Sequence, residues 1–542
     1  MKLVLLLLFC THTLLALTQD EINSLYQQNS LQNRVLENDQ KRHFEKNQQK
    51  TKDYIDKIKP DKLEMKESED KKKCIFINDI MIDKSDILEA KELEEIKKHY
   101  VNKCNTIEDL NNFTKEISNI YISRGFITSR AYLKLQDLSD GIIDISLLEG
   151  KIKKVKNRDL YISNIYDDLE ENILNLQDLE TGIKQLERLR SQVVKLDLKP
   201  SDEVGYTDVL ISKETGYSDY NGYVSVNNYG SSATGKNQVA VYLSYENLFG
   251  INDIISVSIN TTDNVFKTSD NILATSLSYS LPYFKNYFTI SLSTFKYKQT
   301  IYDQFDSTLL SEGSSDIFTL SDEYMLYNSK KYSLNFIAKL NRKDNKNYLS
   351  DTLIELQSYN LTTFSFGFYY IYYGEDSYFS SELLVHKSLS SNIDFTKYTL
   401  DFSYTKYFQH DLQPKINMAL HAQSTGYDVY ATEQLSIGGP YSVRGFKDGG
   451  INGFKGGYIR NDFQVTKNIL NISFSPYLGL DYGYIKATSV VEGGAIIGSS
   501  VGLKIAYLNN LAEIHYNKKL HNTPETKIKS DNFIGFSYSY NF

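Results

Sequence analysis

From about residue 217 to the C-terminus, apolar and polar residues alternate with a period of two, which is typical of β-strands with one apolar face. The clearest runs are Val239-Val241-Leu243-Tyr245, Leu273-Thr275-Leu277-Tyr279, Phe288-Ile290-Leu292, Ile416-Met418-Leu420 and Val501-Leu503-Ile505-Tyr507. Each run spans about 8 to 11 residues and is bounded by Asn, Asp, Gly, Lys or Ser, as transmembrane strands require. Because every backbone donor in a bilayer must be paired, we expect residues 216–542 to form a closed outer-membrane β-barrel of about 16 antiparallel strands.

The C-terminal residues strengthen this expectation, because five aromatic or apolar side chains fall on one face of the last predicted strand. They are Ile534, Phe536, Tyr538, Tyr540 and Phe542. Terminal aromatics mark outer-membrane barrels, so we expect Tyr540 and Phe542 to form the barrel-assembly signal, although Ser537 stands where that signal usually has Gly. The alternative is a soluble β-sandwich, which would not need this alignment.

Between residues 74 and 215 the pattern changes to two rounds of strand and helix signals. Strands are expected at Cys74–Ile82, Ile127–Leu133, Ile142–Leu148, Ile152–Val155, Val193–Leu198 and Thr207–Ser212. Helical faces are expected at Ile87, Leu88, Leu93 and Ile96, at Leu110, Phe113, Ile117 and Ile120, and at Leu176, Leu179, Ile183, Leu186 and Leu189. Thr106 and Asp109 would cap the second helix and Gly125 would end it. We therefore expect two small α/β modules, residues 74–150 and 151–215.

The first 73 residues carry an export signal and a polar segment. Lys2 precedes an apolar run from Leu3 to Leu17, which is shorter than the roughly 20 residues of a membrane-spanning helix. We expect residues 1–18 to be a signal peptide, and a lipoprotein signal at Cys10 is disfavoured by the bulky Phe9. Residues 19–73 are rich in Gln, Asn and charged residues, which predicts a polar N-terminal helix and linker, with a disordered tail as the alternative.

Composition narrows the class of protein. The chain has 43 Tyr, 27 Phe and no Trp, although its mean hydropathy is −0.40 and 24% of its residues are charged. After Gln19 no apolar run approaches about 18 residues, which excludes a helical inner-membrane protein. The net charge of −8 and the pI near 5.7 argue against a nucleic-acid partner, which would need a basic face.

Two cysteines remain once the signal peptide is removed. Cys74 and Cys104 would then lie in an oxidising compartment, where we expect one disulfide, with two buried thiols as the alternative. Closing a loop of about 30 residues would stabilise the module by roughly 3 kcal/mol. No His or Cys pairs stand at ligand spacing, so we expect no metal site.

Several segments resemble a known family. The stretch from Arg124 to Leu133 (RGFITSRAYL), with Leu148–Ile152, is similar to the first periplasmic POTRA domain of two-partner secretion transporters, the haemolysin secretion/activation proteins of the ShlB/FhaC/HecB type. The motif residues are Arg124, Gly125, Phe126, Thr128, Arg130, Gln136 and Asp137, and Cys74 with Cys104 matches the ShlB-like form. Asp178–Leu189 and Val194–Pro200 are similar to the second POTRA domain.

Within the predicted barrel, Gln434–Phe446 resembles the hairpin that folds back into the lumen in this family. Its motif residues are Val443, Arg444, Gly445 and Phe446, and the wall motif on a later strand is Gly479, Asp481 and Gly483. The Gly-Gly-Pro turn would reverse the chain. Arg444 would then need a carboxylate in the lumen, and the resemblance assigns Asp481. Asp462 stands where relatives commonly have Glu. The alternative is an ordinary surface turn.

The resemblance implies an outer-membrane transporter that recognises and translocates a partner exoprotein, a haemolysin or adhesin of the TpsA type, with its POTRA domains in the periplasm. It implies no catalysis and no cofactor, a monomer, and contact with outer-membrane lipids and the barrel-assembly machinery. Whether the chain also activates its exoprotein stays open. The alternatives are a BamA-like assembly factor, a passive porin and a barrel enzyme. For the last we find no His-Glu-x-x-His site, and His410, His421 and His515 are isolated.

Overall fold

The computed structural model describes residues 62–66, 74–214, 218–263, 270–302, 308–329, 331–390, 392–426, 429–447, 449–523 and 532–542. The chain divides into two compact units, one that contains residues 218–542 and one that contains residues 44–217. The predicted signal peptide and most of the predicted polar helix and linker lie outside the described residues. None of the described helices has the length and apolar character needed to cross a bilayer.

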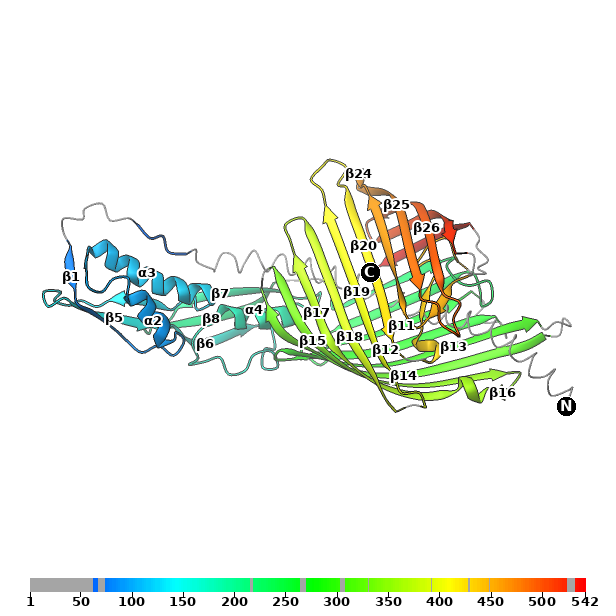
Figure 1. The fold of residues 1–542 in the computed structure, drawn as a ribbon, viewed down its shortest axis with the longest axis horizontal. Helices are drawn as coiled ribbons and strands as arrows, with labels where there is room; N and C mark the ends of the chain where they lie inside the picture. The colour runs from blue at the N-terminus through cyan, green and yellow to red at the C-terminus, as the bar shows by residue number, and fades with distance from the viewer. Residues whose placement is uncertain are drawn as a thin grey trace. The chain divides into compact units, whose positions relative to one another are not determined.

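The larger unit is a closed antiparallel barrel of sixteen long strands (Figure 1). These are β9 (Tyr220–Asn227), β10 (Gln238–Glu246), β11 (Ile254–Thr262), β12 (Asn271–Tyr283), β13 (Asn286–Tyr302), β14 (Thr308–Asn328), β15 (Tyr332–Leu349), β17 (Tyr359–Tyr373), β18 (Ser377–Ser390), β19 (Thr396–Tyr407), β20 (Lys415–Thr425), β23 (Gly456–Gln464), β25 (Ile472–Ile485), β26 (Gly494–Tyr507), β27 (Asn510–Asn522) and β28 (Phe533–Asn541). Two short strands pair at the ends of long ones: β16 (Thr352–Leu353) pairs with β15 and is followed by a 3-10 turn, η1 (Glu355–Gln357), and β24 (Lys467–Ile469) pairs with β25.

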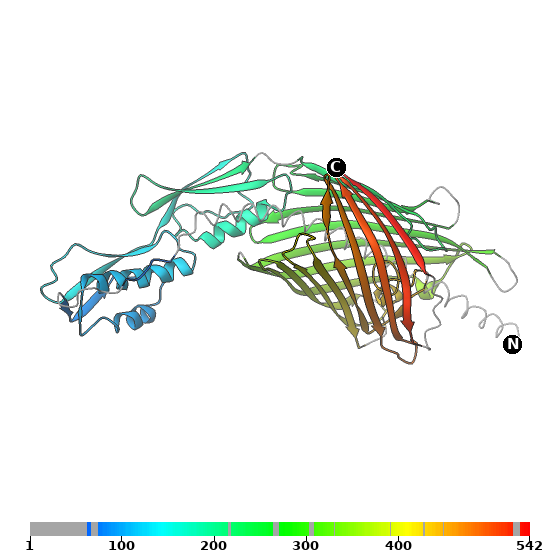
Figure 2. The same ribbon diagram turned by 90° about the horizontal axis from the view of Figure 1, so that it is seen from above.

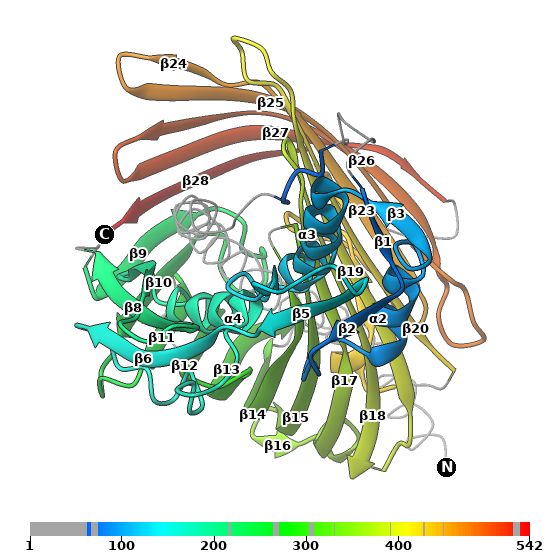
Figure 3. The ribbon, with the colours of Figure 1, turned by 90° about the vertical axis from the view of Figure 1, so that its left-hand side faces the viewer.

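The barrel closes where its last strand meets its first. Tyr540 pairs with Val224, and Phe542 and Gly222 exchange two main-chain hydrogen bonds of 2.9 Å (Figure 3). The five terminal side chains, Ile534 to Phe542, are all exposed on the outside. The closed, antiparallel barrel predicted from the alternation is therefore confirmed, and among the described strands of the barrel none is left as the free edge that a β-sandwich would have.

Strand length differs from the prediction. We expected about 8 to 11 residues, as a bilayer requires, but β13, β14 and β15 have 17, 21 and 18 residues. In β14 the exposed apolar side chains begin at Phe318 and Leu320, whereas the preceding segment Ser311–Asp316 is polar. These strands keep their hydrogen-bond ladders beyond the apolar band, and hydropathy carries no signal for that extension.

The smaller unit contains two α/β modules, each with its helices packed on one face of a sheet (Figure 2). The first has the sheet β2-β5-β4 and the pair β1-β3, with bounds β1 (Ile75–Ile77), β2 (Asp79–Ile82), β3 (Lys103–Asn105), β4 (Arg130–Leu133) and β5 (Ile142–Leu148). Its helices are α2 (Ala90–Lys97) and α3 (Ile107–Ser123). The second has the sheet β6-β8-β7 and one helix, with bounds β6 (Lys151–Arg158), α4 (Leu176–Leu186), β7 (Val193–Pro200) and β8 (Tyr206–Glu214).

The helix signals in the first module hold in part. Thr106 and Asp109 form the predicted capping box of α3, since Asp109 N donates to Thr106 Oγ1 and Thr106 N donates to Asp109 Oδ2. The earlier helix begins only at Ala90, so placing Ile87 and Leu88 in it was wrong. Ser85 explains the difference, because its hydroxyl accepts hydrogen bonds from the N–H groups of both residues and holds a turn.

A disulfide joins Cys74 to Cys104, with 5.3 Å between their Cα atoms. It lies beside the β1-β3 pair, in which Phe76 is opposite Cys104. The predicted bond is confirmed, and it ties the start of the first module to the segment that leads into α3.

Candidate functional site

The segment between β20 and β23 packs inside the barrel. It contains a 3-10 turn, η2 (Ala431–Glu433), and a small hairpin of β21 (Leu435–Ile437) and β22 (Ile451–Gly453). Val443 and Phe446 are fully buried against Ile485 and Ile496 of the wall. On β25 the residues that face this segment alternate with Leu478, Leu480 and Tyr482, which are exposed on the outside. The segment is therefore a lumen loop, as the resemblance implied, and not a surface turn.

Arg444 is bound to Asp481 at the tip of this loop. Its Nε lies 2.7 Å from Asp481 Oδ2, its Nη2 lies 2.7 Å from Oδ1, and its main-chain N donates to Oδ2 over 3.0 Å. The side chains are 1% and 0% exposed. A guanidinium and a carboxylate that meet in this parallel geometry form the strongest type of ion pair, and the third bond also orients the backbone. The structure therefore brings together the two residues that the resemblance paired.

A second carboxylate contacts the same guanidinium. Asp462 Oδ1 on β23 lies 2.7 Å from Arg444 Nη2, so the shorter side chain still reaches the arginine where relatives commonly have Glu. The neighbouring Arg460 donates from Nη1 to the Pro440 carbonyl oxygen over 2.7 Å. Side chains of β23 and β25 thus hold both the tip of the loop and its Gly-Gly-Pro turn.

Glycines let the loop backbone approach the wall. Gly445 has φ +93°, a conformation that favours glycine, and a Cβ added there would come within 2.6 Å of the Lys518 backbone. A Cβ at Gly479 would overlap the Arg444 guanidinium, and one at Gly483 would lie 2.9 Å from Val443 Cγ2. Gly498 on β26 has the same role against the Arg444 carbonyl oxygen. Gly498 was not predicted from the sequence, because it precedes the alternating run Val501–Tyr507 and belongs to neither the loop motif nor the wall motif.

The other side of the loop is anchored by Glu433, which the sequence analysis did not identify. Glu433 Oε1 lies 2.7 Å from Lys343 Nζ on β15, and Oε2 lies 2.6 Å from Lys397 Nζ on β19. The carboxylate is 13% exposed and the lysines are each 11% exposed. Gln423 also donates to the Glu433 carbonyl oxygen over 2.8 Å. Lys343 and Lys397 are 90 and 36 residues away from Glu433 in sequence, and no local motif marks them.

Aromatic contacts support this second anchor. Tyr430 stacks on Tyr359 of β17 with 3.7 Å between ring centroids, and the Tyr359 hydroxyl bonds to Thr432 Oγ1 over 2.5 Å. The loop is therefore held at two places, at Glu433 on the β15–β20 side and at Arg444 on the β23–β26 side.

The Arg124–Arg130 motif forms the junction between the two α/β modules. Gly125, at φ +90°, accepts a hydrogen bond of 2.9 Å at its carbonyl oxygen from Leu176 N at the start of α4. Ser129 Oγ accepts a hydrogen bond of 3.1 Å from Gly150 N. Ile127 lies before β4, not in it as predicted, because its side chain belongs to the core of the second module. The motif fixes one module on the other.

The remaining motif residues are mostly structural. Arg124 pairs with Glu92, Phe126 packs on the first core, and a Cβ added at Gly150 would overlap the Thr128 side chain. Arg130 Nη1 donates to the carbonyl oxygens of Ile127 and Ser129 over 2.8 and 2.7 Å.

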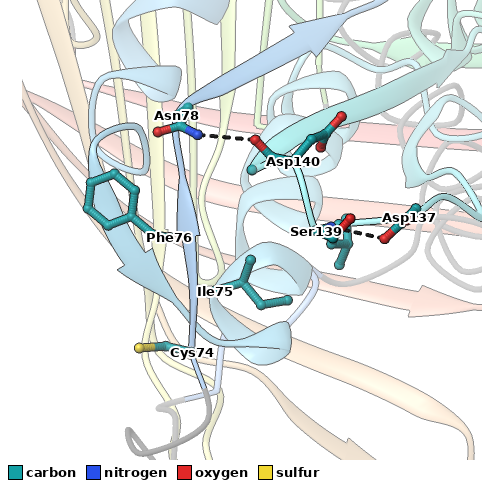
Figure 4. A pocket seen from close by; sticks show the side chains of 9 residues that line it. Cys74, Ile75, Phe76, Asn78, Asp137, Ser139 and Asp140 are labelled. Atoms are coloured by element: carbon teal, nitrogen blue, oxygen red, sulfur yellow. Dashed lines mark hydrogen bonds between the residues drawn. The ribbon is translucent and has the colours of Figure 1, made fainter.

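Gln136 and Asp137 shape the loop that leads into β5. The Gln136 amide bonds to both the N–H and the carbonyl oxygen of Asp144, over 2.7 and 2.8 Å. Asp137 Oδ1 accepts from Ser139 N, and this backbone bond, with the Ser139 hydroxyl, lowers the pKa of the Asp137 carboxyl (Figure 4). Both lie near an open pocket of about 530 Å³ beside β1, whose wall includes Asp137.

The histidines of the barrel have structural partners. His515 Nε2 lies 2.9 Å from the Tyr229 hydroxyl, and His421 Nδ1 lies 2.8 Å from Asp401 Oδ1. His410 accepts from Leu412 N in an exposed loop. Among the residues that the structure describes, no group of three metal-ligating side chains gathers.

Comparison with known proteins assigns the family. The family model of the haemolysin secretion/activation protein ShlB/FhaC/HecB matches residues 205–505. The chain belongs to this family. A ShlB-type POTRA model matches residues 75–150 and a further POTRA model matches residues 145–200, so the two α/β modules are POTRA domains. In this family the POTRA domains are periplasmic, and the barrel places the chain in the outer membrane.

Individual relatives agree with this assignment. The chain is 28% identical over 456 residues to the outer membrane transporter CdiB of Dickeya dadantii (strain 3937), covering 80% of each protein. It is 25% identical over 459 residues to the hemolysin transporter protein ShlB of Serratia marcescens, covering 81% of each. The structure of CdiB from Escherichia coli shares the fold, with a TM-score of 0.83 and 24% identity, over 96% of this chain and 98% of that one.

Proposed function

We propose that this chain translocates a partner exoprotein of the haemolysin or adhesin class across the outer membrane by two-partner secretion. The observation that carries the proposal is the buried Arg444–Asp481 pair, which holds a loop inside the barrel of a member of this family. A passive porin would have no use for two POTRA domains. Relatives that are named hemolysin transporters support this type of cargo.

The POTRA domains would receive the exoprotein as an extended chain. The sheet β2-β5-β4 has β2 and β4 at its edges, and the sheet β6-β8-β7 has β7 at one edge, whereas its other outer strand, β6, is already hydrogen-bonded at Ile152 to Glu171 and Asn172. An edge strand presents unpaired backbone groups, to which an unfolded polypeptide can add as a further strand. This recognition reads the backbone and needs no catalytic group.

The lumen loop would control the export path. An ion pair with buried partners is worth more as a positioning device than as net stability, since desolvation offsets much of its attraction. The pair would therefore act as a latch that keeps the loop against β23 and β25 while the exoprotein passes. The Glu433 anchor would hold the other side of the loop at the same time.

We further propose that the chain works as a monomer, without a cofactor or metal and without nucleic acid. Its exposed outer side chains would contact outer-membrane lipids, and Tyr540 and Phe542 would be recognised by the barrel-assembly machinery. The driving force for translocation would come from folding of the exoprotein outside the cell.

Deletion of the gene tests the proposal. The culture medium should lose one large secreted protein, which is then retained or degraded in the periplasm, while other barrel proteins keep their abundance. Loss of many barrel proteins from the membrane, with no effect on a single exoprotein, would instead identify an assembly factor.

A further inference from the structure

The segment ahead of the first POTRA domain lies along helix α3 and is held by two asparagines. Leu63 N donates to Asn119 Oδ1 over 2.8 Å, and Asn119 Nδ2 donates to the Leu63 carbonyl oxygen over 3.1 Å. Lys66 N donates to Asn112 Oδ1 over 3.1 Å, and Asn112 Nδ2 donates to the Lys66 carbonyl oxygen over 2.7 Å. In Figure 1 this segment, residues 62–66, is the short blue stretch beside α3. Each side-chain amide thus binds both the N–H and the C=O of one residue.

The spacing of the two asparagines matches an extended chain. Seven residues along an α-helix correspond to about 10.5 Å at a rise of about 1.5 Å per residue. An extended chain of the polyproline II type has about three residues per turn and rises about 3.1 Å per residue, so residues three apart face the same side at about 9.3 Å from each other. Two asparagines two turns apart on one helix can therefore bind every third residue of an extended polypeptide that runs in the opposite direction.

This contact reads the backbone and not the sequence of the bound segment. The side chains of Lys62, Glu64, Met65 and Lys66 are exposed, and only that of Leu63 is half-buried. Asparagine is suited to this purpose, because its amide has one acceptor and two donors and matches the N–H and C=O of any non-proline residue. A site with these properties accepts many extended segments.

We propose that Asn112 and Asn119 form a backbone-binding clamp for the unfolded exoprotein, and that residues 62–66 occupy it until the exoprotein displaces them. The inference rests on the proposed export function for the identity of the ligand. Because the linker belongs to the same chain, its effective concentration at the clamp is high, on the order of millimolar. The clamp is therefore closed to weak, short ligands and opens to a long exoprotein that also binds elsewhere on the POTRA domains.

A peptide-binding measurement on the full-length protein in detergent tests the clamp. The probe is a fluorescent peptide of residues 60–69, with two comparison peptides, one of scrambled order and one N-methylated at the positions of Leu63 and Lys66. The protein carries Leu63→Pro and Lys66→Pro, which remove both linker N–H donors and free the clamp. We expect this variant to bind the probe about tenfold more tightly than the wild type.

The asparagines are tested in the same background. Asn112→Ala with Asn119→Ala should reduce probe binding by about tenfold or more. Asn111→Ala is the matched control, because its side chain is a neighbour on the same helix, and it should leave binding unchanged. The scrambled peptide should bind like the probe, and the N-methylated peptide should not bind. Equal binding of the N-methylated peptide, or no effect of the double alanine variant, would overturn the clamp.

Export in cells then separates the clamp from the proposed function. Cells with Asn112→Ala and Asn119→Ala should export less exoprotein than cells with Asn111→Ala, at equal abundance of folded transporter. Normal export by the double variant, although it has lost peptide binding in vitro as predicted, would show that the clamp serves only the linker and would overturn exchange with the exoprotein. The proposed function itself fails only if deletion of the gene leaves the secreted proteins unchanged.

Discussion

The guanidinium and the main-chain N–H of Arg444 both end on the carboxylate of Asp481, a residue 37 positions away on the barrel wall. A side-chain bond alone would leave the backbone of the loop tip free to rotate. The additional N–H bond fixes the direction of the backbone at Arg444, and Gly479, at which a Cβ would overlap Arg444 Nη2, leaves room for the guanidinium against the wall. The tip of the loop is therefore held through both its backbone and its side chain.

Asp481→Asn should loosen the loop without unfolding the barrel. The substitution keeps the shape of the side chain and removes the charge, and breaking a buried pair in this way costs about 3–5 kcal/mol. Limited proteolysis of the purified barrel should show faster cleavage within residues 434–447. Asp411→Asn, at an exposed carboxylate, is the control. Equal protection in both variants would contradict a fixed tip.

Glu433→Gln should release the other side of the loop. It leaves Lys343 and Lys397, each 11% exposed, as like charges without their shared carboxylate. We expect hydrogen exchange to increase in residues 429–437, while the Arg444 side of the loop keeps its protection. Glu355→Gln changes an exposed carboxylate and should have no effect. If both sides of the loop loosened together, the two anchors would be one cooperative unit and not independent.

Gly125→Ala should disturb the junction between the POTRA domains. The residue has φ +90°, where alanine is disfavoured by about 1–2 kcal/mol. The new Cβ would also lie 2.6 Å from Asn175 Oδ1, which caps α4. Amide exchange should increase at Leu176 and Gly150. Gly141→Ala imposes a similar backbone strain away from the junction, so faster exchange at those amides in both variants would assign the effect to general destabilisation.

Cys74→Ser with Cys104→Ser should destabilise the first POTRA domain by about 3 kcal/mol, the value expected for a loop of roughly this length. Thermal unfolding of the full-length protein should show an earlier transition for the POTRA unit and an unchanged transition for the barrel. A reducing agent should have the same effect on the wild type and none on the variant. An unchanged POTRA transition would contradict a stabilising role for the bond.

The barrel and the two modules could be predicted from the sequence because their signals are local. The alternating residues of Val239–Tyr245 identify a strand with one face in lipid without reference to any distant residue. The helix cap at Thr106 can likewise be recognised from four adjacent residues. The Arg444–Asp481 pair could be predicted only from the family resemblance, since neither segment contains a pattern that identifies the other as its partner.

The remaining features depend on contacts between distant residues. Glu433 looks like any loop carboxylate until β15 and β19 place Lys343 and Lys397 around it. The prediction that Ile127 belongs to a strand was wrong for a similar reason. Its side chain packs into the core of the neighbouring module, which a β-like run of residues does not reveal. Asn112 and Asn119 carry no motif and become a site only when an extended segment lies across them.

Export by Arg444→Ala tests the central claim most directly. A strain that lacks the gene is complemented with wild type, with Arg444→Ala, or with Arg342→Ala, which removes an exposed arginine on β15. Exoprotein in the medium is measured against the amount of folded, heat-modifiable barrel in the outer membrane. The account predicts normal barrel levels in all three strains and export lost only with Arg444→Ala. Wild-type export by Arg444→Ala would contradict it and remove the lumen pair from the mechanism.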